Sequence, residues 1–227
     1  MSINSDELFR KTKNLDFENT KDSPLYAEYW KGPDDLRKGG YEPTEETKNN
    51  KFWTLERVWQ ESGYNQKVRD SRSFFRGDEK FNDLSRKRTL VDLGSGKGQA
   101  LLSFAIEWNF NKIIGVEINK DYLDISRENI NNFSHQNPNY ILPEIELLHM
   151  AAGNFEFSKD INFIFMFNPF GPKTCKQVCH NILESLDKYP RELYIFYETA
   201  NHRSIFLETG RFKVIYEKVK YFILKST

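Results

Sequence analysis

The chain has 227 residues, of which 38% are hydrophobic and 29% charged, and its 33 basic and 33 acidic side chains cancel to a net charge of zero. This composition is typical of a single globular domain and excludes an intrinsically disordered chain. It also gives no general attraction to nucleic acids or to anionic membranes.

The sequence shows neither a targeting segment nor a cysteine-rich scaffold. Residues 1–13 are polar, unlike a secretory signal, and no apolar run approaches the roughly 18 residues of a membrane span. Cys175 and Cys179 are the two cysteines, so we expect neither a disulfide scaffold nor a zinc site. These features predict a cytoplasmic protein with no membrane partner and no metal.

The first part of the chain, residues 1–84, is predicted to be a segment of short helices and loops. Aromatic side chains are interrupted there by glycine and proline, which favour turns. One helical pattern places Phe52, Leu55, Val58 and Trp59 on a single face. Residues 85–227 have a different texture and are predicted to form the core of the protein.

Within this core, short β-branched and aromatic runs alternate with amphipathic segments. Strands are predicted at Thr89–Leu93, Lys112–Ile118, Ile145–Met150, Ile161–Phe167 and Leu193–Tyr197, and helices at Gln99–Trp108, Asn119–Phe133 and Pro172–Leu186. Such alternation predicts βαβ units and a doubly wound, mostly parallel sheet flanked by helices.

Two further runs, Phe212–Tyr216 and Tyr221–Leu224, follow the last parallel strand. They lie too close together for a helical crossover and therefore predict an antiparallel hairpin at the edge of the sheet. The expected fold is α/β, with a seven-stranded sheet.

A glycine-rich turn follows the first predicted strand and reads Asp92-Leu93-Gly94-Ser95-Gly96-Lys97-Gly98. A dinucleotide fingerprint starting at Gly94 requires glycine where this chain has Gln99. A P-loop requires Ser or Thr after Lys97, where the chain has Gly98. Both phosphate-binding patterns fail, although glycines at this place still let the backbone pass close to a nucleoside.

The spacing Asp92-x-Gly94-x-Gly96-x-Gly98 resembles motif I of the class I S-adenosylmethionine-dependent methyltransferases. A carboxylate at Asp92 suits a cofactor that carries an ammonium group and a sulfonium. Glu117 lies at the tip of the second predicted strand, where the family has an acid that accepts hydrogen bonds from both ribose hydroxyls. The resemblance implies a Rossmann-like methyltransferase fold and S-adenosyl-L-methionine as cofactor, with Ser95 and Ile118 lying beside it.

The third strand is followed by Ala151 and Ala152, where the family often has an acid beside the adenine amino group. The resemblance implies that backbone groups of these two alanines contact the adenine edge instead, with Asn154 assisting.

After the fourth strand, Asn168-Pro169-Phe170 is similar to the Asn-Pro-Pro-aromatic motif of methyltransferases that modify planar amino groups, although the second proline is missing. The resemblance implies that Asn168 and the Pro169 carbonyl accept hydrogen bonds from the acceptor amine, beside the cofactor, and that Phe170 stacks on the acceptor. The alternative is structural: Asn168 caps the following helix and Phe170 belongs to the core.

Tyr41-Glu42-Pro43 is similar to a Tyr-x-Pro segment that precedes the core in some protein-lysine methyltransferases, including the non-SET nucleosomal histone methyltransferases. The resemblance implies that Tyr41 contacts the cofactor and that residues 1–84 cover the cofactor and the acceptor pocket. A simple turn at the start of a helix explains the same residues.

The sequence thus predicts an enzyme that transfers a methyl group to a small molecule or a protein amine, with nucleic acid not expected as a partner. Asn201 and His202, after the fifth strand, are further candidates for substrate contact. A nicotinamide-dependent oxidoreductase is an alternative that the Gln99 mismatch disfavours. A nucleoside-binding module without catalysis is another, which the Asn168-Pro169-Phe170 segment disfavours.

Overall fold

A computed structural model describes residues 87–167, 169–218 and 221–227, together with seven isolated positions earlier in the chain: Leu8, Thr12, Leu15, Val68, Arg72, Phe74 and Phe75. The predicted division into residues 1–84 and 85–227 stays a prediction, because nearly all of the first part lies outside the described residues.

The described core is one seven-stranded sheet. Its strands are β1 (Thr89–Leu93), β2 (Lys112–Glu117), β3 (Glu144–His149), β4 (Ile161–Phe167), β5 (Tyr194–Glu198), β6 (Phe212–Lys218) and β7 (Tyr221–Ser226). They follow the order β3-β2-β1-β4-β5-β7-β6. The first five strands are parallel, and β7 pairs antiparallel with both β5 and β6. The predicted α/β fold with an antiparallel edge hairpin is confirmed.

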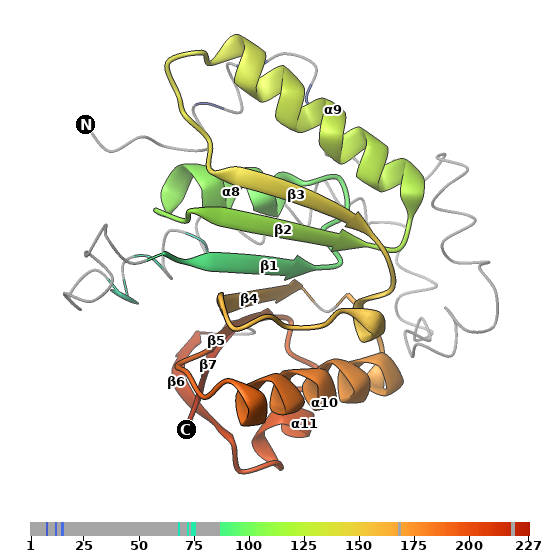
Figure 1. Cartoon of the computed structure of the whole chain (residues 1–227), viewed down its shortest axis with the longest axis vertical. Coiled ribbons are helices and arrows are strands. Elements are labelled where there is room, and N and C mark those ends of the chain that lie inside the picture. Colours follow the sequence, from blue (N-terminus) through green and yellow to red (C-terminus); the bar gives the residue numbers. More distant parts are fainter. Residues whose placement is uncertain are drawn as a thin grey trace.

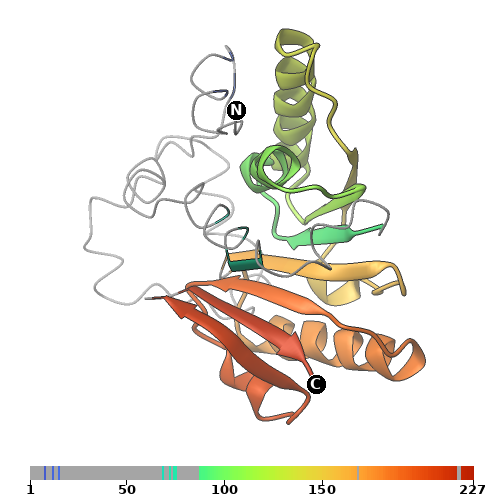
Figure 2. The same cartoon turned by 90° about the vertical axis from the view of Figure 1, so that its left-hand side faces the viewer.

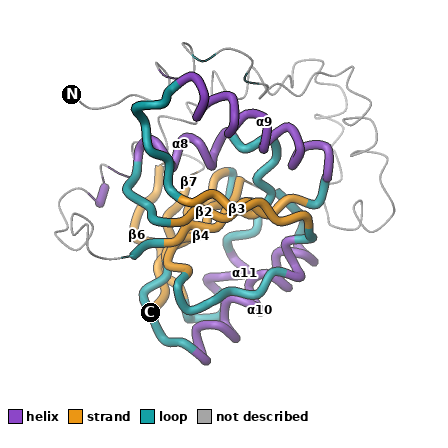
Figure 3. Tube along the Cα trace, turned by 45° about the horizontal axis from the view of Figure 1, so that its top comes forward, coloured by secondary structure: helices purple, strands orange, loops and turns teal. Residues whose placement is uncertain are grey.

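Helices cover both faces of this sheet. They are α8 (Gln99–Glu107), α9 (Lys120–Gln136), α10 (Pro172–Lys188) and the short α11 (Ser204–Leu207), with a single 3₁₀ turn η1 (Ala152–Asn154) after β3. Figures 1 and 3 show α8 and α9 on one face of the strands and α10 and α11 on the other. This arrangement is that of a doubly wound sheet, in which ligands bind at the carboxyl ends of the strands.

The two apolar layers follow the alternation of side chains along the strands. The α10-side cluster contains Val91, Leu93, Val116, Met166, Tyr197, Cys175 and Cys179, among other residues. The α8-side cluster contains Leu90, Leu101, Phe104, Phe163, Phe165, Tyr194 and Phe196. Because neighbouring positions point to opposite layers, the acids Asp92, Glu117 and Glu198 belong to the α8 side.

Helix α10 shows how the sequence sets one of these contacts. Pro172 occupies its first turn, as predicted, because the fixed φ of proline suits a position that has no intrahelical N–H bond. The residues of its apolar stripe are buried: Cys175, Val178, Cys179, Ile182 and Leu186. Burial raises the pKa of the Cys175 thiol to about 12 and that of Cys179 to about 11. Both cysteines belong to the buried apolar cluster on the α10 side of the sheet.

Arg191 lies at the end of the sheet where the parallel strands β4 and β5 begin. Arg191, just before β5, donates hydrogen bonds to the carbonyl oxygens of Ile161, Ser185, Tyr189 and Ser158 at 2.8–3.3 Å. The planar guanidinium has five N–H donors in a fixed fork, whereas a lysine ammonium has three, so arginine suits a site with four carbonyl acceptors. Arg191 thus connects the end of α10 to the starts of β4 and β5. It lies away from the carboxyl ends of the strands, where the candidate site is found.

The hairpin completes the sheet beyond β5. Figure 2 shows β6 and β7 side by side at the end of the sheet that carries the C-terminus. Strand β7 lies between β5 and β6 and is buried over most of its length. None of the described helices is long and apolar enough to cross a membrane.

Candidate cofactor and acceptor site

The turn between β1 and α8 is fixed by backbone bonds to the neighbouring strand. The N–H groups of Gly94 and Ser95 both donate to the Val116 carbonyl, at 2.8 and 3.1 Å. Gly94, Gly96 and Gly98 have positive φ values of 83°, 52° and 82°. Residues with a Cβ rarely adopt this region, which explains the repeated glycines.

Two of these glycines are also close to other elements. A Cβ placed on Gly94 would lie 2.4 Å from Cβ of Pro169, and one on Gly98 would lie 2.2 Å from Oγ of Ser126 in α9. A Cβ on Gly96 would meet no described atom within 4 Å. The loop is therefore packed on both sides, against the segment after β4 and against α9, and leaves open space over Gly96.

Glu117 ends β2 and holds this loop from the side. Its Oε2 accepts a hydrogen bond from the Gly96 N–H at 2.9 Å, and its Oε1 accepts one from the Asn119 N–H at 2.8 Å. Its side chain is only 6% exposed. Burial raises the pKa of this carboxyl, and the backbone donors oppose that rise. Each carboxylate oxygen has lone pairs for a further bond, as the predicted bonds to two ribose hydroxyls require.

Asp92 lies on β1, on the same side of the sheet, and is 2% exposed. Its Oδ2 has no hydrogen-bond partner among the described residues. Burial, together with the charge of Glu117, holds the pKa of this carboxyl well above its ordinary value. A buried acid in this state is costly, and a bound cation would offset the cost.

The segment after β3 borders the same region. The Met150 N–H donates to the Glu117 carbonyl at 3.0 Å, which continues the strand pairing past β3. The turn η1 begins at Ala152, and the side-chain amide of Asn181 in α10 donates to the carbonyls of Gly153 and Phe155. Ala151 and Ala152 are half-buried at the edge of the site. The predicted role of their backbone groups toward adenine stays a prediction.

Ile118, which follows Glu117 directly, has an exposed apolar side chain. It was predicted to end the second strand, but β2 stops at Glu117 and Ile118 is 40% exposed. The carbonyl of Ile118 lies 3.0 Å from Nε2 of His149. An exposed aliphatic residue directly after the acid that is predicted to hold the ribose is a suitable surface for a flat, largely apolar base.

These features together fit S-adenosylmethionine. Asp92 and Glu117 supply negative charge and hydrogen-bond acceptors, Ile118 supplies an apolar surface, and the open side of Gly96 supplies room for the nucleoside or the amino-acid portion. The buried Oγ of Ser95 also has no hydrogen-bond partner among the described residues. No group of three potential metal ligands occurs in the described part of the chain.

Several predicted residues are brought together, and two fall outside what can be described. Pro169 contacts the Gly94 position, so the turn after β1 and the segment after β4 are neighbours. Phe170 is half-buried and packs against the α10-side cluster, which supports its structural alternative. Tyr41 and Asn168 lie outside the described residues. The N-cap of α10 is Gly171, three positions after Asn168, which disfavours the helix-capping alternative for Asn168.

One buried acid at this edge was not anticipated from the sequence. Glu198 ends β5 and is 3% exposed. Its position after a run of apolar strand residues is the signal that was available, since Asp92 and Glu117 have the same setting. Asn201 and His202, the residues that were expected to face the substrate after this strand, lie farther along the same loop.

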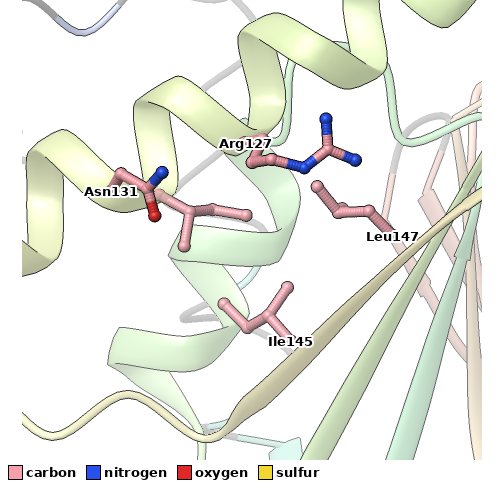
Figure 4. A pocket seen from close by; sticks show the side chains of 5 residues that line it. Arg127, Asn131, Ile145 and Leu147 are labelled. Atoms are coloured by element: carbon pink, nitrogen blue, oxygen red, sulfur yellow. The ribbon is translucent and has the colours of Figure 1, made fainter.

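A hollow of about 290 Å³ lies elsewhere, between α9 and β3 (Figure 4). It is lined by Arg127, Ile130, Asn131, Ile145 and Leu147. Figure 4 shows Ile145 and Leu147 pointing from β3 toward α9. None of these residues belongs to the glycine loop or to the buried acids, so this hollow is separate from the candidate site.

We expect Glu117→Ala to weaken binding of S-adenosylhomocysteine at least tenfold. A hydrogen bond to a charged group contributes about 1.5–3 kcal/mol, and 1.4 kcal/mol corresponds to a factor of ten. Titration calorimetry measures the affinity. The matched control is Glu146→Ala on β3, which removes an exposed ion-pair partner of Lys112. Equal affinity in a folded Glu117→Ala protein would show that this carboxylate does not hold the ribose.

The comparisons with known proteins agree with this geometry. The family model for "Histone methylation protein DOT1" matches residues 79–165, less than half of the chain. It covers the glycine loop and Glu117 and ends before Asn168. The match supports the similarity to non-SET histone methyltransferases, although it does not include the Tyr41 segment on which that similarity was drawn. No curated protein sequence matches the chain significantly.

Solved structures of methyltransferases are similar to the chain at low identity, and the first described here shows the same fold. A protein from Methanococcus maripaludis described as an S-adenosyl-L-methionine-dependent methyltransferase has 14% identity and a TM-score of 0.52, and the alignment covers 76% of this chain and 90% of that one. A SAM-dependent methyltransferase from Methanosarcina mazei has 13% identity, with 66% and 97% covered and a TM-score of 0.49. A protein from Pyrococcus horikoshii described as an RNA methyltransferase has 16% identity, with 72% and 81% covered and a TM-score of 0.43.

The strand order disfavours the oxidoreductase alternative. Dinucleotide-binding sheets have the strand order 3-2-1-4-5-6, whereas here the antiparallel β7 lies between β5 and β6. The family match favours an enzyme over a module that only binds a nucleoside. From its sheet order and its glycine loop with two buried acids, the chain has the fold of the class I S-adenosylmethionine-dependent methyltransferases, and its residues 79–165 are similar to the histone methylation family.

Proposed function

We propose that the chain transfers the methyl group to an amine nitrogen of a protein or a small molecule. The observation that carries this proposal is the contact between the Gly94 position and Pro169. Pro169 belongs to the segment Asn168-Pro169-Phe170, which resembles an amine-methylating motif, and its proximity to the glycine loop supports a role of this motif at the cofactor. The description of the matching family, which names histone methylation, favours a protein amine.

When bound, S-adenosylmethionine would supply an electrophilic methyl group, whose transfer would form an N–C bond, break the C–S bond with its electron pair left on sulfur, and move the positive charge to nitrogen. The task left to the protein is to exclude water and to align the nitrogen, which can supply most of the acceleration. An amide oxygen of Asn168 accepts an N–H of the amine and so orients its lone pair. After transfer, the nitrogen loses a proton to solvent.

The acceptor class is tested with labelled S-adenosylmethionine and three separate pools, namely total cell protein, small metabolites and RNA. Label that enters methylated amines after acid hydrolysis of the protein pool, or amines of the metabolite pool, is the expected result. Label that enters RNA alone would make the chain a nucleic-acid methyltransferase and would refute the amine proposal.

We expect Asn168→Ala to reduce turnover at least tenfold while S-adenosylhomocysteine affinity stays nearly unchanged, because the amide acts on the acceptor. Asn131→Ala, an exposed change on α9, is the control. Melting temperature and rate are measured on one preparation. A lowered melting temperature with a full rate per folded molecule would assign Asn168 a purely structural role, worth about 1 kcal/mol for a helix cap.

A further inference from the structure

The buried face of α9 carries two polar side chains that the roles assigned above do not use. The buried residues of this helix are Tyr122, Leu123, Ser126, Asn129 and Phe133. Asn129 is only 1% exposed, and Ser126 is fully buried. A buried polar group is costly unless it is hydrogen-bonded, so a polar pair in the middle of a largely apolar face indicates a specific role.

Both side chains lie against the glycine loop. The side-chain amide of Asn129 donates to the Lys97 carbonyl at 2.9 Å. A Cβ on Gly98 would lie 2.2 Å from Oγ of Ser126, so this hydroxyl occupies the space that a side chain at Gly98 would need. The Lys97 ammonium lies 5.9 Å from the ring centre of Tyr122, within the range of cation–π contacts. Helix α9 therefore contacts the loop through both its backbone and the Lys97 side chain.

These contacts fall on a tight turn of the backbone. The Gly98 N–H donates at 3.0 Å to the carbonyl three residues earlier, so Gly96 and Lys97 are the central residues of a four-residue turn. The peptide group before Gly96 is held from β2, because Oε2 of Glu117 accepts the Gly96 N–H. The peptide group after Lys97 is held from α9, because Asn129 donates to its carbonyl. The Gly96–Lys97 peptide is thus fixed on both flanks.

The same acid connects the start of α9 to the loop. Oε1 of Glu117 accepts the N–H of Asn119, which is the N-cap of α9. The loop, the tip of β2 and α9 are therefore joined in a closed set of hydrogen bonds, with Glu117 at one corner and Asn129 at the other. Gly96, between these two holds, is the position where an added Cβ would meet no described atom within 4 Å.

We propose that Asn129 is a positioning residue for S-adenosylmethionine, which holds the Gly96–Lys97 peptide in place beside Glu117 before the cofactor binds. A loop that already has its binding conformation costs less to order when the ligand arrives. Asn129 acts through the Lys97 carbonyl and does not have to touch the cofactor. This inference concerns cofactor binding and does not depend on the amine acceptor proposed above.

The test compares Asn129→Asp, which keeps the size of the side chain but loses the amide donor, with Asn131→Asp, the same change at an exposed position of the same helix. Titration calorimetry measures the affinity for S-adenosylhomocysteine per folded molecule, and thermal melts measure stability. We expect the affinity to fall at least tenfold in Asn129→Asp and to be unchanged in Asn131→Asp. Asn129→Ala, which removes the donor without adding an acceptor, replaces Asn129→Asp if that variant does not fold.

A double-mutant cycle with Glu117→Ala separates positioning from a purely structural role. Because both side chains act on one turn, the variant with Glu117→Ala and Asn129→Ala should lose less affinity than the product of the two single losses. Amide hydrogen exchange gives a second readout. Asn129→Ala should accelerate exchange of the Gly96 N–H while the amides of β1 and β2 keep their protection, since the loosening is local.

Equal S-adenosylhomocysteine affinity in a folded Asn129 variant, single losses that multiply independently, or faster exchange throughout β1 and β2 would each overturn the inference. It also fails, together with the cofactor assignment, if the wild type does not bind S-adenosylhomocysteine. If the wild type binds it but labels no amine, the proposed function fails and the positioning role of Asn129 is still decided by the affinities.

Discussion

Asp92→Asn should stabilise the cofactor-free protein at pH 7 and, at the same time, weaken binding of S-adenosylmethionine at least tenfold. The substitution removes a carboxylate that burial and the charge of Glu117 disfavour, while it keeps the size of the side chain. For a chain of this length each kcal/mol shifts the melting temperature by about 2–4 °C, so a rise of about 3 °C or more is expected. The cofactor loses the negative charge that faces its cationic groups, which explains the opposite sign of the two effects.

The dependence on pH gives this prediction a second readout. The pKa of Asp92 in the folded protein is raised above its ordinary value of 3.8, so the folded state holds the proton more tightly than the unfolded state does. The stability that this provides is complete below pH 3.8 and is lost as the pH rises through the folded pKa. The difference in melting temperature between Asp92→Asn and the wild type should therefore be small near pH 4 and grow toward pH 7.

Asp160→Asn, an exposed change in the turn before β4, controls for the loss of a charge as such and should change neither quantity much. Thermal melts without cofactor and calorimetric titrations at pH 7 supply both measurements. A lower melting temperature for Asp92→Asn at pH 7 would mean that Asp92 stabilises the empty site, contrary to the role assigned to it.

Gly94→Ala is expected to abolish measurable cofactor binding and to destabilise the fold. The new Cβ would overlap Cβ of Pro169 at 2.4 Å, so the turn after β1 and the segment after β4 must separate. The positive φ of 83° adds strain of about 1–2 kcal/mol. Because both effects act on the loop that carries the site, a loss of affinity of about a hundredfold or more is expected, equivalent to about 2.8 kcal/mol.

Substitutions at two other glycines separate the effect of backbone strain from the effect of the overlap with Pro169. Gly210 has a φ of 69° and open space around its Cβ position, far along the chain near β6, so Gly210→Ala reports the backbone strain alone. The Cβ of Gly96→Ala would meet no described atom either, and the φ of Gly96 is 52°. This substitution should lower the stability as Gly210→Ala does, but it should also reduce S-adenosylhomocysteine affinity if the cofactor occupies the open space. If Gly94→Ala and Gly210→Ala behave alike, the contact with Pro169 has no consequence for the site.

Local sequence patterns predicted most of the fold because each pattern reflects a local cause. The bounds of β1 and β4 were predicted without error, since both strands are short apolar runs between turn residues. The second strand ends one residue early because the Glu117 carboxylate binds the Asn119 N–H and turns the chain. The third strand starts one residue early, at Glu144, which pairs with Lys112 in the register.

The features that sequence reasoning missed depend on contacts between distant segments. A glutamate at the end of a strand usually points to solvent, and the burial of Glu198, which pairs with Tyr221 of β7, was not predictable from its own segment. Helix α11 has four residues, too few for a periodic pattern. The exposure of Ile118 and the burial of Phe170 likewise follow from the sheet and α10. The roles of Tyr41 and Asn168 stay predictions.

The position of β7 has a consequence for how the chain acquires its fold during synthesis. On the ribosome, residues are made in order, so β6 emerges before β7, yet β7 is the strand that pairs with β5. Until residues 221–226 appear, β5 presents an unpaired edge next to an apolar face, and β6 has no partner among the strands already made. Such an edge invites pairing with another nascent chain. This enzyme should therefore depend on prompt completion of translation or on a chaperone, and ribosome stalling between β5 and β7 should produce aggregates that stalling after β7 does not.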